Sequence, residues 1–81
     1  MVTQIRRAAI SIPSNIAEGH GRNSNPDFSR FLHISLGSIC EIETLLEIGL
    51  ELGYFSDGKS ILVQLDELAK MISSLINKLG N

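Results

Sequence analysis

The chain has 81 residues, 43% of them hydrophobic and 20% charged, and a formal net charge of −2. That length allows one small domain, residues 1–81, and the hydrophobic content excludes an intrinsically disordered tail. With no tryptophan and only 5% aromatic residues, the core is expected to be aliphatic, and the slight negative charge does not by itself indicate a nucleic-acid-binding protein.

An amphipathic helix is predicted from about Val2 to Glu18. Its apolar face follows the helical spacing of three and four residues and consists of Ile5, Ala8, Ala9, Ile12 and Ile16. Pro13 lacks the amide that would bond the carbonyl of Ala9, so the helix is expected to kink there. The alternative is a second helix that starts near Asn15, because Asn15 followed by Glu18 resembles a capping box. We predict one kinked helix rather than two.

Two further faces run along this first helix. A polar stripe on the side opposite the apolar face holds Arg7, Ser11, Ser14 and Glu18. A smaller apolar patch between the two faces holds Ile10, Pro13 and Ala17. A surface helix of a monomer rarely carries a second apolar patch, so this helix is expected to contact more than one neighbour.

The second helix is predicted from Pro26 to about Leu52, after a glycine-containing loop. Asn25 is the expected N-cap, and Pro26 suits the first helical position. The main apolar stripe consists of Phe28, Leu32, Ile39, Ile42, Leu46 and Leu50. A second apolar arc beside it consists of Phe31, Ile34, Leu45, Ile48 and Leu52.

Small residues interrupt the wide apolar arc of the second helix at Ser35, Ser38 and Gly49, where another helix is expected to approach closely. Only a narrow strip is left polar, and it holds Ser29, His33, Glu43, Glu47 and Glu51. This helix is therefore expected to touch more than one neighbour.

The third helix is expected to begin with Ser56 or Asp57 as its cap and to end at Gly80. Its apolar residues alternate by four and three in a heptad seam that consists of Ile61, Leu65, Leu68, Ile72, Leu75 and Leu79. The seam is widened by Leu62, Ala69 and Ile76. No strand-like alternation occurs in the sequence. The predicted fold is all-α: three helices in an antiparallel up-and-down bundle, because the connections are short.

The single cysteine, Cys40, cannot form an internal disulfide, which is typical of a reducing cytoplasm. No segment approaches the ~20 apolar residues of a transmembrane helix, and the N-terminus lacks the pattern of a secretory signal. We therefore predict a cytoplasmic protein that is not inserted in a membrane.

Two stretches carry a family resemblance: QIRRAAISIPSNIAEG at residues 4–19, and FSRFLHISLGSICEIETLLEIGLELGY at residues 28–54. They resemble the four-helix-bundle family of intervening sequences in bacterial 23S ribosomal RNA genes, often labelled "S23 ribosomal protein". The resemblance covers essentially the whole chain. It implies an antiparallel four-helix bundle that forms a homopentamer. It also implies a link to the accessory protein of diversity-generating retroelements, which binds nucleic acid and a reverse transcriptase.

Members of that family carry a further N-terminal helix before the region that matches Thr3. The three helices predicted here therefore match helices 2–4, and the domain is expected to lack the family's N-terminal helix. Loss of one bundle helix would expose an apolar patch larger than the few hundred Å² that are normal for a soluble monomer. We therefore expect the chain to oligomerise or to rearrange.

The sequence carries no pattern typical of an enzyme or a metal site. His20 and His33 lack metal-ligand spacing, and Ser11, Ser14 and Ser24 lack the context of a nucleophile elbow. No glycine pattern follows a strand to hold a phosphate. We expect no enzymatic activity, no metal and no cofactor.

The arginines are the candidate functional residues. Arg6, Arg7, Arg22 and Arg30 belong to the first helix, its loop and the start of the second helix, and are expected near one end. Repeated around a ring, they would contact phosphates without reading the base sequence. The alternative is that Arg6 and Arg7 pair with acidic residues within or between subunits. The candidate subunit-interface residues are Arg7, Ser11, Ser14, Glu18, Glu41 and Glu43.

Two functions are left open. The first, which the resemblance implies, is a non-enzymatic oligomeric accessory protein that binds RNA or DNA phosphates. The second is a structural or protein-interaction module whose charged residues serve only subunit assembly. The expected partners are further copies of the chain, nucleic acid and a protein such as a reverse transcriptase.

Overall fold

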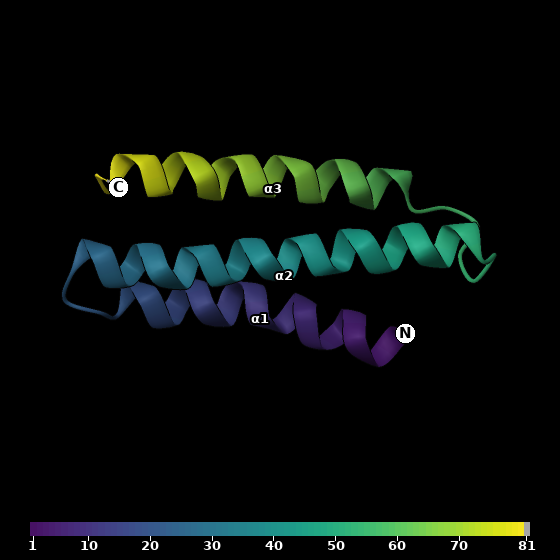
Figure 1. Cartoon of the computed structure of the whole chain (residues 1–81), viewed down its shortest axis with the longest axis horizontal. Helices are drawn as coiled ribbons and strands as arrows, with labels where there is room; N and C mark the ends of the chain where they lie inside the picture. Colours follow the sequence, from purple (N-terminus) through teal and green to yellow (C-terminus); the bar gives the residue numbers. More distant parts are fainter. Residues whose placement is uncertain (81) are drawn as a thin grey trace.

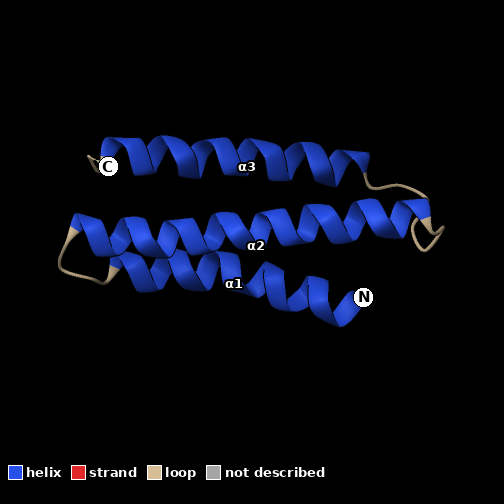
Figure 2. Ribbon diagram, in the orientation of Figure 1, coloured by secondary structure: helices blue, strands red, loops and turns tan. Residues whose placement is uncertain are grey.

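A computed structural model describes residues 1–80, which form three helices: α1 (Val2–His20), α2 (Asn25–Glu51) and α3 (Lys59–Lys78). Successive helices run in opposite directions (Figure 1), and residues 1–80 contain no strand (Figure 2). The predicted all-α, up-and-down helical bundle is confirmed. Asn81, the last residue of the predicted domain, lies outside the described residues.

The longest helix, α2, lies between the other two (Figure 1). It packs against both, whereas no Cα atom of α1 lies within 8 Å of one in α3. On α2, Ser35 and Ser38 contact α1, and Leu50 contacts the start of α3. In helical projection these two directions differ by about 90° around the axis of α2. The three helices therefore stand at three corners of a square in cross-section, with α1 and α3 diagonally opposite.

The core is aliphatic, as predicted, and α2 supplies half of it. The buried cluster consists of Ala8, Ile12, Leu32, Ile39, Ile42, Leu46, Ile72 and Ile76. The main stripe predicted for α2 is thus largely buried, but three members of its second arc, Ile34, Ile48 and Leu52, are exposed. Ser29, which was predicted in the polar strip, is buried.

One continuous helix, α1, passes through Pro13 and ends at His20, so the alternative of a second helix from Asn15 is wrong. The Asn15 side chain does not cap a helix. Its Nδ2 instead donates to the carbonyl of Ser11 at 2.8 Å and to the Ser11 hydroxyl at 2.9 Å. The N-terminal part of α1 diverges from α2 (Figure 1), as expected for a helix interrupted by proline.

Two predicted helix caps are wrong. Ser24, rather than Asn25, caps α2: its hydroxyl accepts from the amide of Asp27 at 3.3 Å. The Asn25 amide instead reaches the Leu79 carbonyl at 3.5 Å, across to the end of α3. Gly58 precedes α3 without a side-chain cap, and it packs under Leu50, so packing sets the start of this helix.

The predicted seam of α3 is rotated in the structure. Ile72 and Ile76 are its buried residues, whereas Ile61 is 48% exposed. The remaining seam leucines are only half-buried, and they are Leu65, Leu68, Leu75 and Leu79. One side of α3 therefore carries apolar residues that α2 does not cover.

Candidate functional site

The turn between α1 and α2 brings two of the candidate arginines together. It is closed by Gly19, where an added Cβ would lie 2.7 Å from the Cβ of Phe31 and 3.0 Å from Cδ1 of Phe28. The absence of a side chain at Gly19 thus lets the end of α1 lie directly against the start of α2. Phe31 is buried by this contact, and Arg22 and Arg30 flank it in sequence on the loop and on α2.

Both guanidinium groups lie over the ring of Phe31. The Cζ of Arg22 is 5.0 Å from the ring centroid, and the Cζ of Arg30 is 4.5 Å from it. Such cation–π contacts contribute about 0.5–1 kcal/mol each at exposed sites. The two side chains are 44% and 59% exposed, so their N–H donors remain accessible from solvent. The Phe31 ring is therefore in contact with both guanidinium groups at the end of the molecule that carries the α1–α2 turn.

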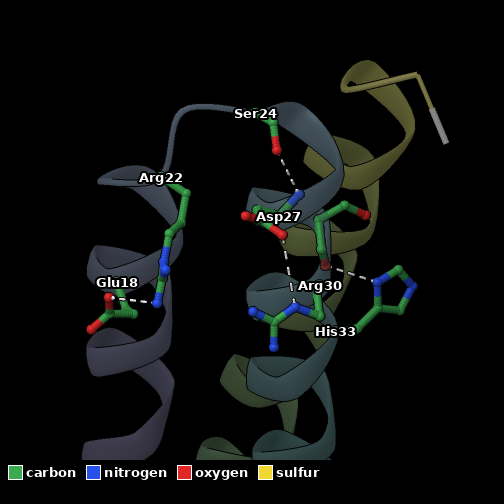
Figure 3. Close-up of polar contacts among 7 residues, drawn as sticks. Glu18, Arg22, Ser24, Asp27, Arg30 and His33 are labelled. Carbon is green, nitrogen blue, oxygen red and sulfur yellow. Dashed lines mark hydrogen bonds and ion pairs between the residues drawn. The ribbon is translucent and has the colours of Figure 1, made fainter.

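Each of these arginines has a carboxylate neighbour (Figure 3). Arg22 Nη2 lies 3.2 Å from Glu18 Oε2, and Arg30 Nε lies 4.0 Å from Asp27 Oδ1. Exposed ion pairs of this kind contribute about 0–1 kcal/mol, so another anion can compete for the guanidinium groups. Asp27 also lies in the first turn of α2, where the helix dipole favours negative charge.

The two histidines make local contacts near the same turn. The ring of His20 lies edge-on to Phe28 with centroids 5.8 Å apart. The Nδ1 of His33 donates to the carbonyl of Ser29 at 2.9 Å (Figure 3). Within residues 1–80, no group of three or more His, Cys, Asp or Glu side chains could hold a metal ion.

The other two arginines lie elsewhere. Arg7 precedes Arg22 by fifteen positions, which at the rise of an α-helix is roughly 20 Å along α1. The prediction that all four arginines lie near one end is therefore wrong. Arg6 and Arg7 are exposed, and neither forms an ion pair with any residue in the described range 1–80, including Glu41 and Glu43.

The predicted polar stripe of α1 does not lie wholly opposite the core. Ser11 faces α2, where its hydroxyl accepts from the Ser38 hydroxyl at 2.8 Å. Beside it, the buried hydroxyl of Ser35 donates to the carbonyl of Ile12 at 3.0 Å. Ser11 thus belongs to the contact between α1 and α2 of the same chain. Of the other candidate interface residues, Arg7, Ser14, Glu18 and Glu41 are exposed and Glu43 is half-buried.

The Phe31 contact and the Ser35 bond were not predicted. Both depend on how closely α1 approaches α2, which is a tertiary property. The only sequence signal was the set of small residues, Gly19 on one helix and Ser35 and Ser38 on the other.

Comparison with known families gives a match over most of the chain. A family model described as "23S rRNA-intervening sequence protein" matches residues 1–74. The chain belongs to this family. The match includes all of α1 and α2 and most of α3, so all four candidate arginines lie inside it. Comparison with curated proteins found no match. The link to retroelement accessory proteins stays a prediction.

No helix in the described part of this family member, residues 1–80, has the length and apolar character needed to cross a bilayer. A shallow recess at the C-terminal end of α2 is lined by Glu47, Ile48, Glu51 and Leu52. Its lining comes from the last turns of α2 and the C-cap residue Leu52, so this recess is open to solvent and adds no enclosed site.

Proposed function

We propose that this member of the 23S rRNA-intervening sequence family is a non-enzymatic accessory protein that binds nucleic-acid phosphates through Arg22 and Arg30. The observation that carries the proposal is the pair of guanidinium groups over the Phe31 ring, at 5.0 and 4.5 Å from its centroid. The family description names a ribosomal RNA gene segment, which supports nucleic acid as the ligand class.

The chemistry of arginine favours phosphate as the ligand of this pair. Each guanidinium presents several N–H donors in a planar fork that matches the oxygens of a phosphate. Contact with an aromatic ring restricts the position of a guanidinium and leaves its N–H donors directed outward from the ring. Such contacts recognise the backbone and not the base sequence, so we expect binding that is independent of base sequence.

The neighbouring carboxylates limit the affinity of one chain. Glu18 and Asp27 balance the two arginine charges at the turn, and a phosphate must displace them. We therefore expect weak binding by a single turn, in the range of about 10⁻⁴–10⁻⁶ M that is typical of sequence-independent contacts. An assembly that presents several turns to one nucleic acid would bind more tightly through multivalency.

The proposal is tested by a matched pair of double variants. Arg22→Gln with Arg30→Gln removes two charges at the turn, and Arg6→Gln with Arg7→Gln removes two charges elsewhere. We expect the turn variant to lose most of its affinity for duplex RNA in fluorescence anisotropy and the second variant to retain it. Equal losses of RNA affinity in both double variants would mean that only the net charge of the protein matters. That result would contradict a binding site at the turn.

A second candidate function, assembly alone, is favoured by a different observation. Arg6 and Arg7 are exposed and form no ion pair within residues 1–80, so they are available to carboxylates of another subunit. If the unmodified protein shows no salt-sensitive binding to RNA or DNA, this second function replaces the first. A reverse-transcriptase partner and a cytoplasmic location stay predictions under either function.

A further inference from the structure

His33 lies beside one of the two arginines of the proposed phosphate site. It follows Arg30 by three positions on α2, and residues at this spacing are neighbours on a helix surface, with Cβ atoms roughly 5–6 Å apart. In helical projection the two side chains differ by about 60° around the axis of α2. Both side chains are exposed. A nucleic-acid strand that contacts Arg30 can therefore also reach the His33 ring.

One hydrogen bond determines which ring nitrogen of His33 carries the proton. Nδ1 lies 2.9 Å from the Ser29 carbonyl oxygen (Figure 3), and a carbonyl oxygen can only accept, so Nδ1 is the donor. A neutral imidazole has a single N–H, which leaves Nε2 with a lone pair and no proton. Nε2 has no hydrogen-bond partner within residues 1–80. Neutral His33 therefore presents an acceptor, which cannot bond a phosphodiester oxygen.

Uptake of one proton from solvent at Nε2 reverses this property. The cationic ring donates from both nitrogens, so Nε2–H can contact a phosphate oxygen while Nδ1–H keeps its bond to Ser29. Histidine side chains change charge between about pH 5 and pH 8. A phosphate anion beside a histidine favours its charged form. Phosphate binding and proton uptake at His33 should therefore strengthen each other.

Neither α1 nor α2, both within the described range, directs a carboxylate at His33. Arg30 is its charged neighbour on α2, and Gly37, one turn further on, adds no side chain. Asp27, the carboxylate next to Arg30, is separated from His33 by about 120° around the axis. The helix α1 packs on the opposite side of α2, because Ser35, which bonds to α1, is about 160° from His33. The charge closest to His33 on these two helices is therefore that of Arg30.

The charges of α3 near His33 balance each other. The contacts at the two ends of α2 place His33 at the level of roughly residue 73 of α3. The charged side chains of α3 within about two turns of that level are Asp66, Glu67, Lys70 and Lys78. Two are negative and two are positive, and Lys70 Nζ pairs with Asp66 Oδ2 at 3.1 Å. The helix α3 therefore adds no net charge at this level.

We propose that His33 in its protonated form is a third phosphate contact beside Arg22 and Arg30, so that nucleic-acid binding by the α1–α2 turn strengthens as the pH falls from about 8 to about 6. This inference rests on the proposed function, because it adds one residue and one proton to the same phosphate site. The contact is fully present when His33 is charged and is lost as the pH rises and the ring becomes neutral.

Fluorescence anisotropy with duplex RNA at about pH 6 and pH 8 tests the inference on the full 81-residue chain. We expect the unmodified protein to bind about two- to fivefold more tightly at the lower pH, the effect of one exposed ion pair. The slope of log affinity against log salt should also be steeper there by about one. His33→Gln should lose most of this pH dependence. His33→Arg, which is charged throughout, should bind at the higher pH as tightly as the unmodified protein does at the lower pH.

His20→Gln is the matched control, because it removes the same kind of titrating side chain from the same end of the molecule. The His20 ring packs edge-on against Phe28, which is about 160° around α2 from Arg30. His20 therefore lies on the other side of α2 from Arg30, and this variant should keep the full pH dependence. Circular dichroism checks that each variant is still helical.

Failure of the inference and failure of the proposed function give different results. RNA binding that requires Arg22 and Arg30 but has the same affinity at both pH values would overturn the inference alone. The inference also fails if His20→Gln and His33→Gln lose the pH dependence to the same extent, because the effect would then follow the net charge of the protein. Absence of salt-sensitive RNA binding at both pH values would overturn the proposed function and the inference with it.

Discussion

The substitution Gly19→Ala tests the close approach of α1 and α2 on which the candidate site depends. The added Cβ would lie 2.7 Å from the Phe31 Cβ and 3.3 Å from the carbonyl oxygen of Phe28. Both atoms are fixed by the backbone of α2, so the helices must separate for the methyl group to fit. Overpacking of this kind costs about 1–3 kcal/mol, and this contact belongs at the upper end of that range.

The gain in helix propensity opposes that steric cost. Alanine is favoured over glycine inside a helix by about 1 kcal/mol, and less near a helix end such as this one. The expected net effect of Gly19→Ala is therefore a loss of about 1–2 kcal/mol. Gly37→Ala in α2 is the matched control, because its added Cβ would have no atom within 4 Å apart from those of the adjoining helix backbone and chain neighbours. That control should gain about 0.5–1 kcal/mol from helix propensity alone.

Urea unfolding followed by circular dichroism measures both variants. One protein concentration must be used throughout, because any self-association would make the stability depend on concentration. The expected result is a lower unfolding midpoint for Gly19→Ala and a higher one for Gly37→Ala. If both substitutions stabilise the protein equally, the close contact at Gly19 does not exist, and the support for the Phe31 site is lost with it.

Two further predictions concern hydroxyl groups. Ser24→Ala removes the N-cap of α2 and should lower the free energy of unfolding by about 0.5–2 kcal/mol in the same urea assay. Ser35→Ala removes the buried bond to the Ile12 carbonyl and should cost about 1 kcal/mol. Ser74→Ala, on the exposed side of α3, is the control for both and should change stability by less than about 0.5 kcal/mol. A cost at Ser24 or Ser35 no larger than this control would contradict the corresponding bond.

Local patterns were sufficient to predict the three helices and most of the core. The spacing of Leu32, Ile39, Ile42 and Leu46 requires one buried face of a helix, whatever packs on it. The two wrong cap predictions show that local sequence preferences alone do not determine where a helix begins. Ser24 and Asn25 are both good capping residues, and in the structure the Asn25 side chain reaches the distant end of α3 while Ser24 caps the helix.

The continuity of α1 through Pro13 was predicted. The carbonyl that Pro13 leaves without a helical partner is that of Ala9, whereas the hydroxyl of Ser35 donates to the carbonyl of Ile12 and so holds α1 against α2 beside the kink. The separation of Arg6 and Arg7 from the turn was predictable from the rise of a helix alone. The pairing of Arg22 with Arg30 over Phe31 was not, since it requires the approach that Gly19 allows.

The salt dependence of nucleic-acid binding tests the central proposal most directly. The affinity for duplex RNA is measured over a range of salt concentrations for the unmodified protein and for the Arg22→Gln, Arg30→Gln double variant. Each phosphate contact that is lost should reduce the slope of log affinity against log salt by about one. We expect the slope of the double variant to be shallower by about two. Identical slopes would contradict phosphate binding by the α1–α2 turn.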